Sequence, residues 1–362
     1  MTKPYLRISL ALFALGYGYS SQAVSGDNTS WAPAPYRLGQ GINFPQFDLN
    51  IGGYISVRYE DVADQDWTVG ARDLSLFVSK NFSNRWQVFS ELEIGQALEV
   101  SPNNISERDS EIDLERLYGD YRATNEVTFR IGKFLTPVGH WNQIHADPLV
   151  WTVDRPLTTA APFARHTTGV MAYGSFPAAQ NDWDYNLFID DSALLDPAQK
   201  NELAFEDSSS GVSPRNAFKR AAGARLSYHF LNDSANLGAS YLRFAMHDLN
   251  ERKDLFGIDA LWTINGMEFS GEWIYRDSLG TAEQDERGGF LQAVLPLSQH
   301  LYLIGRQERY KAAVLPPLVT INSVGLTFRP HQAIAVKLEY RDGRRNEVLA
   351  PTGWLGSLAI LF

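Results

Sequence analysis

The stretch Ala333-Ile-Ala-Val-Lys-Leu-Glu-Tyr-Arg-Asp342 alternates apolar and charged side chains. Successive side chains of a β-strand point to opposite faces, so this period of two predicts a strand. Its apolar face would hold Ile334, Val336, Leu338 and Tyr340, and its other face Lys337, Glu339 and Arg341. A face that carries whole charges needs water or ionic partners. The surroundings of such strands therefore decide the fold.

The same alternation recurs in sixteen segments from Leu49 to the end of the chain. They are Leu49–Tyr59, Thr68–Lys80, Trp86–Ala97, Ile112–Ala123, Val127–Phe134, His166–Phe176, Trp183–Asp190, Ala217–Phe230, Ala235–Met246, Lys253–Ile264, Met267–Asp277, Arg287–Pro296, Leu301–Lys311, Val319–Arg329, Ala333–Asp342 and Gly353–Phe362. The alternation is weak in Ala235–Met246 and Arg287–Pro296, so the facing of these two segments stays open.

The connections between the segments are alternately short and long. The short ones include Asn81–Arg85, Thr124–Glu126, Asn265–Gly266 and Pro330–Gln332, and the long ones Val100–Glu111, Thr136–Ala164 and Asp191–Asn216. Bacterial outer-membrane barrels have short periplasmic turns and longer external loops. The order of these connections therefore predicts an even number of strands with both chain ends on the periplasmic side.

A water-soluble β-sandwich also has alternating strands, so the nature of the two faces must decide. Here the polar faces carry whole charges, and large aromatic residues recur near strand ends, as at Trp86, Trp183, Trp262 and Phe328. Aromatic girdles around an apolar belt are typical of a lipid interface, and backbone groups in hydrocarbon must pair within a closed sheet. No apolar run reaches the roughly 20 residues that a spanning helix needs. The sequence predicts an all-β protein, a transmembrane antiparallel β-barrel of about 16 strands over residues 47–362.

The N-terminus has the pattern of a secretory signal. Lys3 and Arg7 precede the apolar run Ile8–Tyr17, and Ser21-Gln-Ala23 offers small residues for cleavage, so residues 1–23 are expected to be a signal peptide for the Sec pathway. Residues 24–46 would form a polar, Pro- and Gly-rich periplasmic segment. Without Lys3 and Arg7 the chain has 30 basic and 42 acidic residues, a formal charge of −12, which disfavours nucleic acid as a partner. The absence of cysteine fits an oxidising compartment.

Thr136–Ala164 is the longest stretch between two strands without alternation, and it would be the third external loop. A segment of this length without secondary structure is usually functional or disordered, and the run Leu149-Val-Trp151 argues against disorder. The loop could fold into the barrel as a constriction loop. The alternative is an ordinary external loop packed over its own strands.

Two segments resemble a known family. Gly353–Phe362 resembles the C-terminal strand of Gram-negative outer-membrane proteins that the barrel assembly machinery recognises, with Trp354, Leu358, Ile360 and Phe362 on one face. Gly356 and Ile360, where that pattern often has Tyr, are departures. Arg130–Gly139 is similar to the strand-into-loop passage of porins related to the phosphate-selective porins O and P. The resemblance implies a homotrimeric sixteen-stranded channel in the outer membrane, surrounded by lipid and lipopolysaccharide, with the third external loop folded inward.

The departures from that family limit what can be transferred. Its phosphate-selective members line the pore with arginines and lysines, whereas here Glu91, Glu93, Glu272 and Glu308 stand among the arginines on the polar faces. Phosphate specificity therefore does not transfer. Residues 24–46 are also too short and too Pro-rich for the longer periplasmic segment of those members.

The candidate site is the loop together with the polar face of the wall. If the loop lies inside the barrel, Trp141, Leu149 and Trp151 should pack on the wall, and the polar loop residues should border the solute path. These polar residues are His140, His145, Asp147, Asp154 and Arg155. The wall would contribute Arg116, Arg122 and Arg130, which are expected to face the loop, and Glu91, Glu93, Asp120 and Arg306. A ring of charges at a constriction sets the ion preference of a channel.

The favoured function is a passive channel for small hydrophilic solutes or ions, since barrels of sixteen strands leave an aqueous lumen. The competing function is a structural barrel that sheathes a periplasmic or electron-carrying partner. An outer-membrane hydrolase is less favoured because the sequence has no Gly-x-Ser-x-Gly motif, and no catalytic residue or cofactor is predicted. Anion or cation preference stays open, because a slip of one residue in register would invert each face.

Two clusters contain residue types that bind metal ions. His140 and His145, with Asp147, Asp154 and His166 nearby in the sequence, match no standard spacing of metal ligands. The acidic run Glu107–Asp113 lacks the fixed ligand spacing of a calcium loop, and a solvated loop is the simpler interpretation. No metal site is predicted.

Overall fold

The computed structural model describes residues 33–106, 111–144, 146–160, 162–178, 181–196, 217–246, 252–279, 285–312, 318–344 and 350–362. The expected signal peptide, residues 24–32 of the 24–46 segment, His145 and part of the acidic run Glu107–Asp113 lie outside these ranges. No helix in the described part of the chain is long and apolar enough to cross a membrane.

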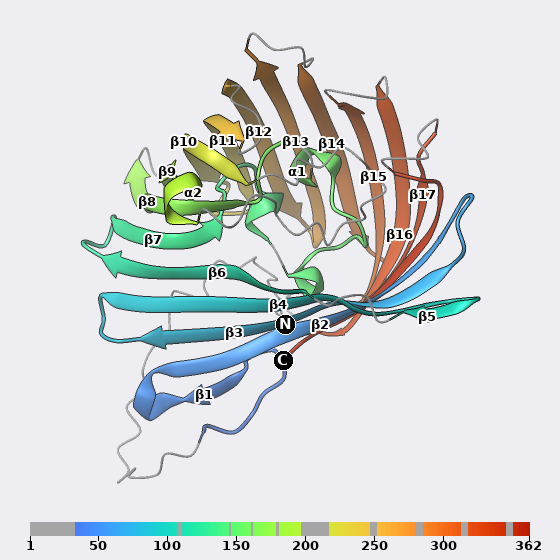
Figure 1. Cartoon of the computed structure of the whole chain (residues 1–362), viewed down its shortest axis with the longest axis horizontal. Helices are drawn as coiled ribbons and strands as arrows, with labels where there is room; N and C mark the ends of the chain where they lie inside the picture. The colour runs from blue at the N-terminus through green and yellow to red at the C-terminus, as the bar shows by residue number, and fades with distance from the viewer. Residues whose placement is uncertain are drawn as a thin grey trace, which may run out of the picture.

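The chain forms one closed antiparallel sheet (Figure 1). Sixteen long strands make up the ring: β2 (Leu49–Val62), β3 (Thr68–Asn81), β4 (Trp86–Ser101), β6 (Glu111–Arg122), β7 (Thr128–Leu135), β8 (His166–Ala178), β9 (Asn181–Asp190), β10 (Phe218–Phe230), β11 (Ala235–Met246), β12 (Arg252–Ile264), β13 (Met267–Ser278), β14 (Glu286–Pro296), β15 (Leu301–Lys311), β16 (Val319–His331), β17 (Ile334–Asp342) and β18 (Gly353–Leu361). Each pairs with the next, and β18 pairs with β2, with Leu358 opposite Val57, which closes the ring. The predicted sixteen-stranded barrel is confirmed.

Several short elements were not predicted. β1 (Ile42–Phe44) lies within the segment 24–46 and pairs with β2, and β5 (Asn104–Ser106) folds back on β4. The short helices are η2 (Pro45–Phe47), η3 (Trp141–Gln143), η4 (Asp147–Leu149), α1 (Leu157–Ala160) and α2 (Ser192–Leu195). Three of them, η3, η4 and α1, lie in the loop 136–164.

The turn between β12 and β13 illustrates how local sequence sets the register. Asn265 and Gly266 have φ angles of 50° and 79°, the left-handed conformation that a two-residue hairpin of type I′ requires. Asn tolerates this conformation and Gly has no Cβ to oppose it. The strands on either side pair without a shift from Lys253↔Ser278 to Ile264↔Met267.

Burial is inverted relative to a water-soluble protein. Along β17, Lys337, Glu339 and Arg341 are buried, whereas Leu338 is 48% exposed. The same holds in β14, where Leu291 is 74% exposed and its neighbour Gln292 only 3%. Apolar side chains thus cover the outside of the ring and charged ones the inside, as a barrel in lipid requires.

Bulges change the facing of single residues in two strands. In β3, Asp73 lies opposite Ser56 of β2 and Ala71 lies opposite Val57, so that Arg72 is an extra residue against β2. In β6 a shift brings both Glu115 and Arg116 to the inner side, where Glu115 is buried and Arg116 pairs with Glu91. A bulge inserts one residue and re-aims the side chains beside it.

The largest apolar cluster joins the two ends of loop 136–164 to the inner side of β8–β12. Phe134, Val138, Phe163 and Ala164 pack there with Met171, Phe188, Phe218, Ala221, Leu242, Phe244, Met246 and Leu255. This cluster holds both ends of the loop against the wall, from which the rest of the loop extends toward β13–β17 (Figure 1).

Candidate functional site

The two ends of the loop are fastened to each other. The backbone N–H of Thr136 donates to the carbonyl of Arg165 at 2.7 Å, and the Thr136 hydroxyl donates to the carbonyl of Ala164 at 2.9 Å. The Asn142 amide donates to the carbonyls of Thr136 and Arg165. These bonds join the two ends of the loop in a closed neck.

Gly139 allows the loop to approach β13 closely. Its φ is +65°, and a Cβ at this position would lie 2.5 Å from the Glu272 carboxylate. Without that Cβ, one Glu272 oxygen accepts the backbone N–H groups of His140 and Trp141, each at 2.7 Å. A carboxylate that accepts two amides makes charge-assisted bonds stronger than neutral ones. Burial lowers the pKa of His140 to about 4, with Arg225 acting in the same direction, so its imidazole is neutral near pH 7.

Two more wall glutamates bind the loop backbone in the same way. Glu339 of β17 accepts the N–H of Val153, and Glu308 of β15 accepts the N–H of Leu157, each at 2.9 Å. Both carboxylates are buried. Their partner groups belong to the backbone, so these contacts depend on the path of the loop and not on its side chains.

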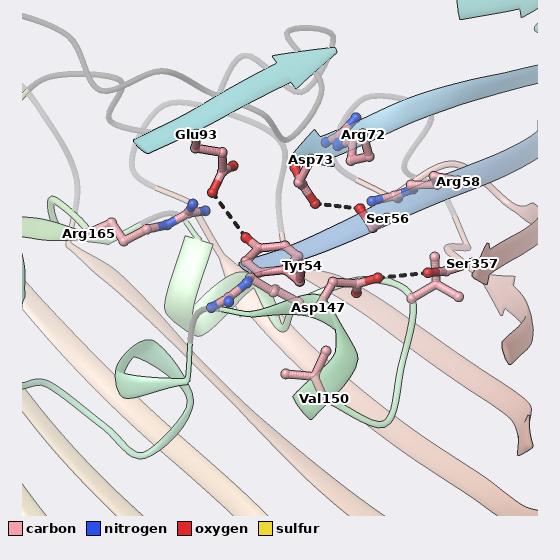
Figure 2. A pocket seen from close by; sticks show the side chains of 12 residues that line it. Tyr54, Ser56, Arg58, Arg72, Asp73, Glu93, Asp147, Val150, Arg165 and Ser357 are labelled. Carbon is pink, nitrogen blue, oxygen red and sulfur yellow. Dashed lines mark hydrogen bonds between the residues drawn. The ribbon is translucent and has the colours of Figure 1, made fainter. Parts of the chain in front are cut away.

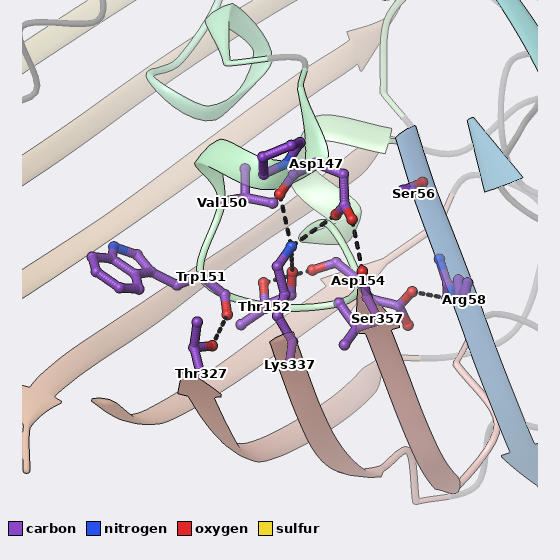
Figure 3. Close-up of polar contacts among 12 residues, drawn as sticks. Ser56, Arg58, Asp147, Val150, Trp151, Thr152, Asp154, Thr327, Lys337 and Ser357 are labelled. Atoms are coloured by element: carbon purple, nitrogen blue, oxygen red, sulfur yellow. Dashed lines mark hydrogen bonds and ion pairs between the residues drawn. The ribbon is translucent and has the colours of Figure 1, made fainter. Parts of the chain in front are cut away.

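Asp147 is the charged centre of the contact between the loop and β17–β18 (Figure 3). The Lys337 ammonium donates to its carboxylate and to its carbonyl, both at 2.8 Å, and the Ser357 hydroxyl donates to the other carboxylate oxygen at 2.7 Å. Lys337 also reaches the carbonyl of Thr152 at 3.1 Å. Burial alone would raise the pKa of the Asp147 carboxyl, but Lys337 and Ser357 hold it below its usual value. Asp147 is therefore ionised at neutral pH.

Asp154 bridges two wall arginines. Its carboxylate pairs with Arg341 of β17 and with Arg58 of β2. Arg306 of β15 donates to the Thr152 hydroxyl at 2.7 Å and to the carbonyl of Asp154 at 2.8 Å. The tip of the loop is thus bound to β15, β17 and β2, strands on the side of the ring away from β7 and β8.

Two tryptophans of the loop pack on the inner side of β14 and β15. Trp141 meets Phe290 edge to face at 6.0 Å, and Trp151 lies 4.8 Å from Tyr302, measured between ring centroids. The Trp151 indole N–H donates to Glu268 at 3.0 Å, which satisfies its one polar group. Leu149 is half-buried.

The wall arginines expected to face the loop have wall partners in the structure. Arg116 pairs with Glu91 of β4, and Arg130 of β7 forms a two-pronged bond to Asp120 of β6 with both distances at 2.8 Å. Arg122 is half-buried at the end of β6. The described basic partners of the loop carboxylates, Lys337, Arg341 and Arg58, lie on other strands, because the loop reaches past β6 and β7.

A cavity of about 60 Å³ lies between the loop and the wall of β2–β4 and β18 (Figure 2). The wall contributes Tyr54, Ser56, Arg58, Arg72, Asp73, Glu93 and Ser357, and the loop side contributes Asp147, Val150, Val153, Arg155 and Arg165. Four arginines face three acids, so both signs of charge meet at this narrow place.

The sequence predicts only part of this lining. Glu93, Asp147 and Arg155 were among the candidate residues, whereas Arg58, Arg72, Asp73 and Arg165 were not. Strict alternation would put Arg72 and Asp73 on opposite faces, and only the bulge lets both reach the cavity. Arg58 stands on the polar face of β2, a signal that the sequence did contain.

The structure offers no metal centre in the ranges it describes. No three His, Asp or Glu side chains of those residues gather closely enough to hold an ion. His166, one of the weighed ligands, pairs instead with the buried Glu115 at 2.6 Å.

Comparison with known proteins places the fold. No protein-family profile matches the sequence. An uncharacterized protein of Aquifex aeolicus is 24% identical over 348 residues, which cover 83% of this chain and 78% of that protein.

Several solved structures share the architecture at low sequence identity. OmpF of Salmonella typhi, in complex with daunomycin, superposes with a TM-score of 0.59 at 11% identity over 87% of this chain and 97% of that one. An anion-selective porin of Comamonas acidovorans superposes with a TM-score of 0.57 at 13% identity, over 87% of this chain and 99% of that one. A variant of OmpT, an outer membrane protein of Vibrio cholerae, that lacks loop L8 superposes with a TM-score of 0.57 at 10% identity, over 87% of this chain and 99% of that one. The chain therefore has the fold of the outer-membrane porin barrels.

Proposed function

We propose that the chain forms a water-filled channel through which small hydrophilic solutes or ions diffuse passively across the outer membrane of a Gram-negative bacterium. The observation that carries the proposal is the inverted burial of the strands, with ion pairs inside the ring and bulky apolar side chains outside it. A charged inner face has no use in a barrel filled by an apolar core, but it suits a lumen that holds water.

The loop 136–164 is proposed to lie inside the barrel and to narrow the channel. Its bonds to inward-facing groups of β13, β15, β17, β18 and β2 support this position. On this proposal the cavity beside Tyr54 and Asp147 belongs to the narrowest part of the solute path. The residues proposed to line this narrowest part are Glu93, Asp147 and Arg155, which the sequence predicted, together with Arg58, Arg72, Asp73 and Arg165.

The same proposal covers assembly. The signal peptide expected at residues 1–23 would lead the chain to the Sec pathway. The last strand, ending at Phe362, would be read by the barrel assembly machinery. A homotrimer is the expected assembly, and the solved likenesses include a trimer form of OmpT from Vibrio cholerae. No catalytic step is part of the proposed function.

Planar-bilayer recording of the purified, folded protein tests the channel. Stepwise conductance increments should appear, and the reversal potential in a salt gradient would give the ion preference, which the mixture of four arginines and three acids at the cavity does not decide. Folded protein that inserts without any conductance would overturn the proposal.

The sheath alternative makes a different prediction. A barrel that encloses a protein partner needs a lumen clear of its own loop, and the bonds from the loop to Glu272, Glu339 and Lys337 speak against that. A partner that co-purifies in a fixed ratio, with no conductance by the barrel alone, would favour the sheath instead.

A further inference from the structure

A row of aromatic and arginine side chains runs across the inner wall on β3 to β8. It consists of Phe77, Phe89, Arg116, Tyr118, Arg130 and Tyr173, named here the aromatic strip. Successive ring centroids lie 5.9 Å apart for Phe77 and Phe89 and 5.3 Å for Phe89 and Tyr118. Tyr54, which lines the cavity, extends the row at 5.7 Å from Phe77.

The aromatic strip faces the interior of the ring. The neighbours of Phe77 and Arg130 in sequence, Leu76 and Ile131, are 43% and 62% exposed on the outside, so alternation places Phe77 and Arg130 inside. The four rings are half-buried, not enclosed. Aromatic carbon on the wet side of a barrel is costly to leave in contact with water, which calls for a function.

Two guanidinium groups lie on the rings. The Arg130 guanidinium carbon is 3.6 Å from the centroid of Tyr118 and 5.0 Å from that of Tyr173, and that of Arg116 is 4.7 Å from Phe89. Such stacking fixes the plane of each guanidinium. The strip therefore holds aromatic and cationic groups packed against one another in one continuous row.

The sign of the charge that a solute meets follows from exposure. The Arg116 and Arg130 side chains are 18% and 19% exposed, whereas their partners Glu91 and Asp120 are 0% and 10% exposed. The arginines are thus the more exposed members of the two ion pairs, and a solute reaches a cation before it reaches the paired carboxylate.

We propose that the aromatic strip is a weak binding surface for ring-shaped solutes that carry a carboxylate, of which benzoate is the simplest. The solute ring would lie against the edges of Phe89 and Tyr118, in the edge-to-face geometry that aromatic pairs favour, while its carboxylate meets a guanidinium edge. The proposal rests on the proposed channel function and names the solute class for which the path is adapted. Binding must remain weak, because a solute that stays would block conduction.

Current block in planar bilayers tests the proposal. Benzoate should reduce the open-channel potassium chloride current at lower concentration than acetate, which has the carboxylate without the ring, or glucose, which has a ring without the charge. In the variant Phe89→Leu/Tyr118→Leu, which keeps apolar volume and removes both rings, the benzoate concentration for half block should rise about tenfold, since each aromatic contact is worth about two- to tenfold in affinity. Tyr118→Phe keeps the ring, so the benzoate concentration for half block should equal that of the unchanged protein.

Two outcomes would overturn the proposal: equal block by benzoate and either comparator, or unchanged benzoate block in the double variant. If the double variant does not fold, Tyr118→Leu alone replaces it, with an expected rise of about threefold. A protein that never conducts would refute the proposed channel function. A protein that conducts but is blocked equally by ring and non-ring solutes would refute only the proposed binding role of the aromatic strip.

Discussion

At the residue scale, Lys337 shows what a buried charge does in this barrel. Its side chain is 1% exposed, and its three donors are satisfied by the Asp147 carboxylate and two loop carbonyls. In Lys337→Met the Asp147 carboxylate would keep Ser357 but lose its cation, at a cost of about 2–4 kcal/mol in the free energy of unfolding. The loss should be measured by urea unfolding in detergent micelles.

A second substitution makes that prediction specific to the pair. Lys337→Met/Asp147→Asn leaves no bare charge, so it should be less destabilised than the single variant, with a coupling of about 0.5–3 kcal/mol. Arg85→Met removes an exposed cation from the turn after β3 and should stay within about 0.5 kcal/mol of the unchanged protein. A double variant as unstable as Lys337→Met would show that Asp147 does not depend on Lys337.

The sequence also predicts, residue by residue, which side chains face the inside of the barrel. Parity along a strand gives the face of a residue, and it placed Lys337, Glu339 and Arg341 correctly on the inner side. The alternation rule fails beside a bulge, as at Arg72 and Glu115. The residue types at these positions do not indicate that an extra residue is inserted there. Partners across the ring depend on the path of the loop, which local sequence does not determine.

At the element scale, strands and loop differ in how they are specified. Each strand is fixed by the alternation of its own residues and by short turns such as Asn265–Gly266, so all sixteen were predicted to within a few residues. Weak alternation in Ala235–Met246 did not prevent a regular strand, because β10 and β12 supply its register. The loop is specified by contacts with distant strands, so the sequence predicted its bounds and the packing of Trp141 and Trp151 on the wall, but not which strands they meet.

Deleting about ten residues around Asp147 tests the role of the loop as an element. If the loop narrows the channel, the deletion should raise single-channel conductance, since it removes the tip that carries Asp147 and Trp151. The neck from Thr136 to Ala164 and the cluster around Phe163 would remain, so the barrel should still assemble. Heat-modifiable migration on gels would establish that the deleted protein is folded.

A matched deletion controls for loss of any loop. The connection 63–67 between β2 and β3 can be shortened without removing a described contact of the loop 136–164, and conductance should not change. Unchanged conductance after the Asp147 deletion, in a folded barrel, would mean that the loop does not narrow the path.

At the scale of the whole molecule, the ring is turned inside out relative to a soluble protein, and its environment follows from that. Leu291 lies in the middle of β14 and is 74% exposed, surrounded on neighbouring strands by Gly271 and Gln307. On a protein in water, replacement of such a leucine by arginine is close to neutral. In a bilayer the same change places a charge at mid-depth, which costs about 2–4 kcal/mol in transmembrane barrels.

The variant Leu291→Arg should therefore fold into lipid vesicles with a free energy of unfolding lower by about 2–4 kcal/mol. The matched variant Leu297→Arg changes a leucine that is 56% exposed in the turn after β14, outside the apolar belt, and should cost about 0–1 kcal/mol. Reversible unfolding from vesicles, followed by tryptophan fluorescence, measures both. The difference between the two variants is the decisive result, because a general intolerance of arginine would lower the free energy of unfolding equally at both sites. Equal small effects at Leu291 and Leu297 would mean that the apolar face of the ring does not contact lipid, and the proposed channel would lose its membrane.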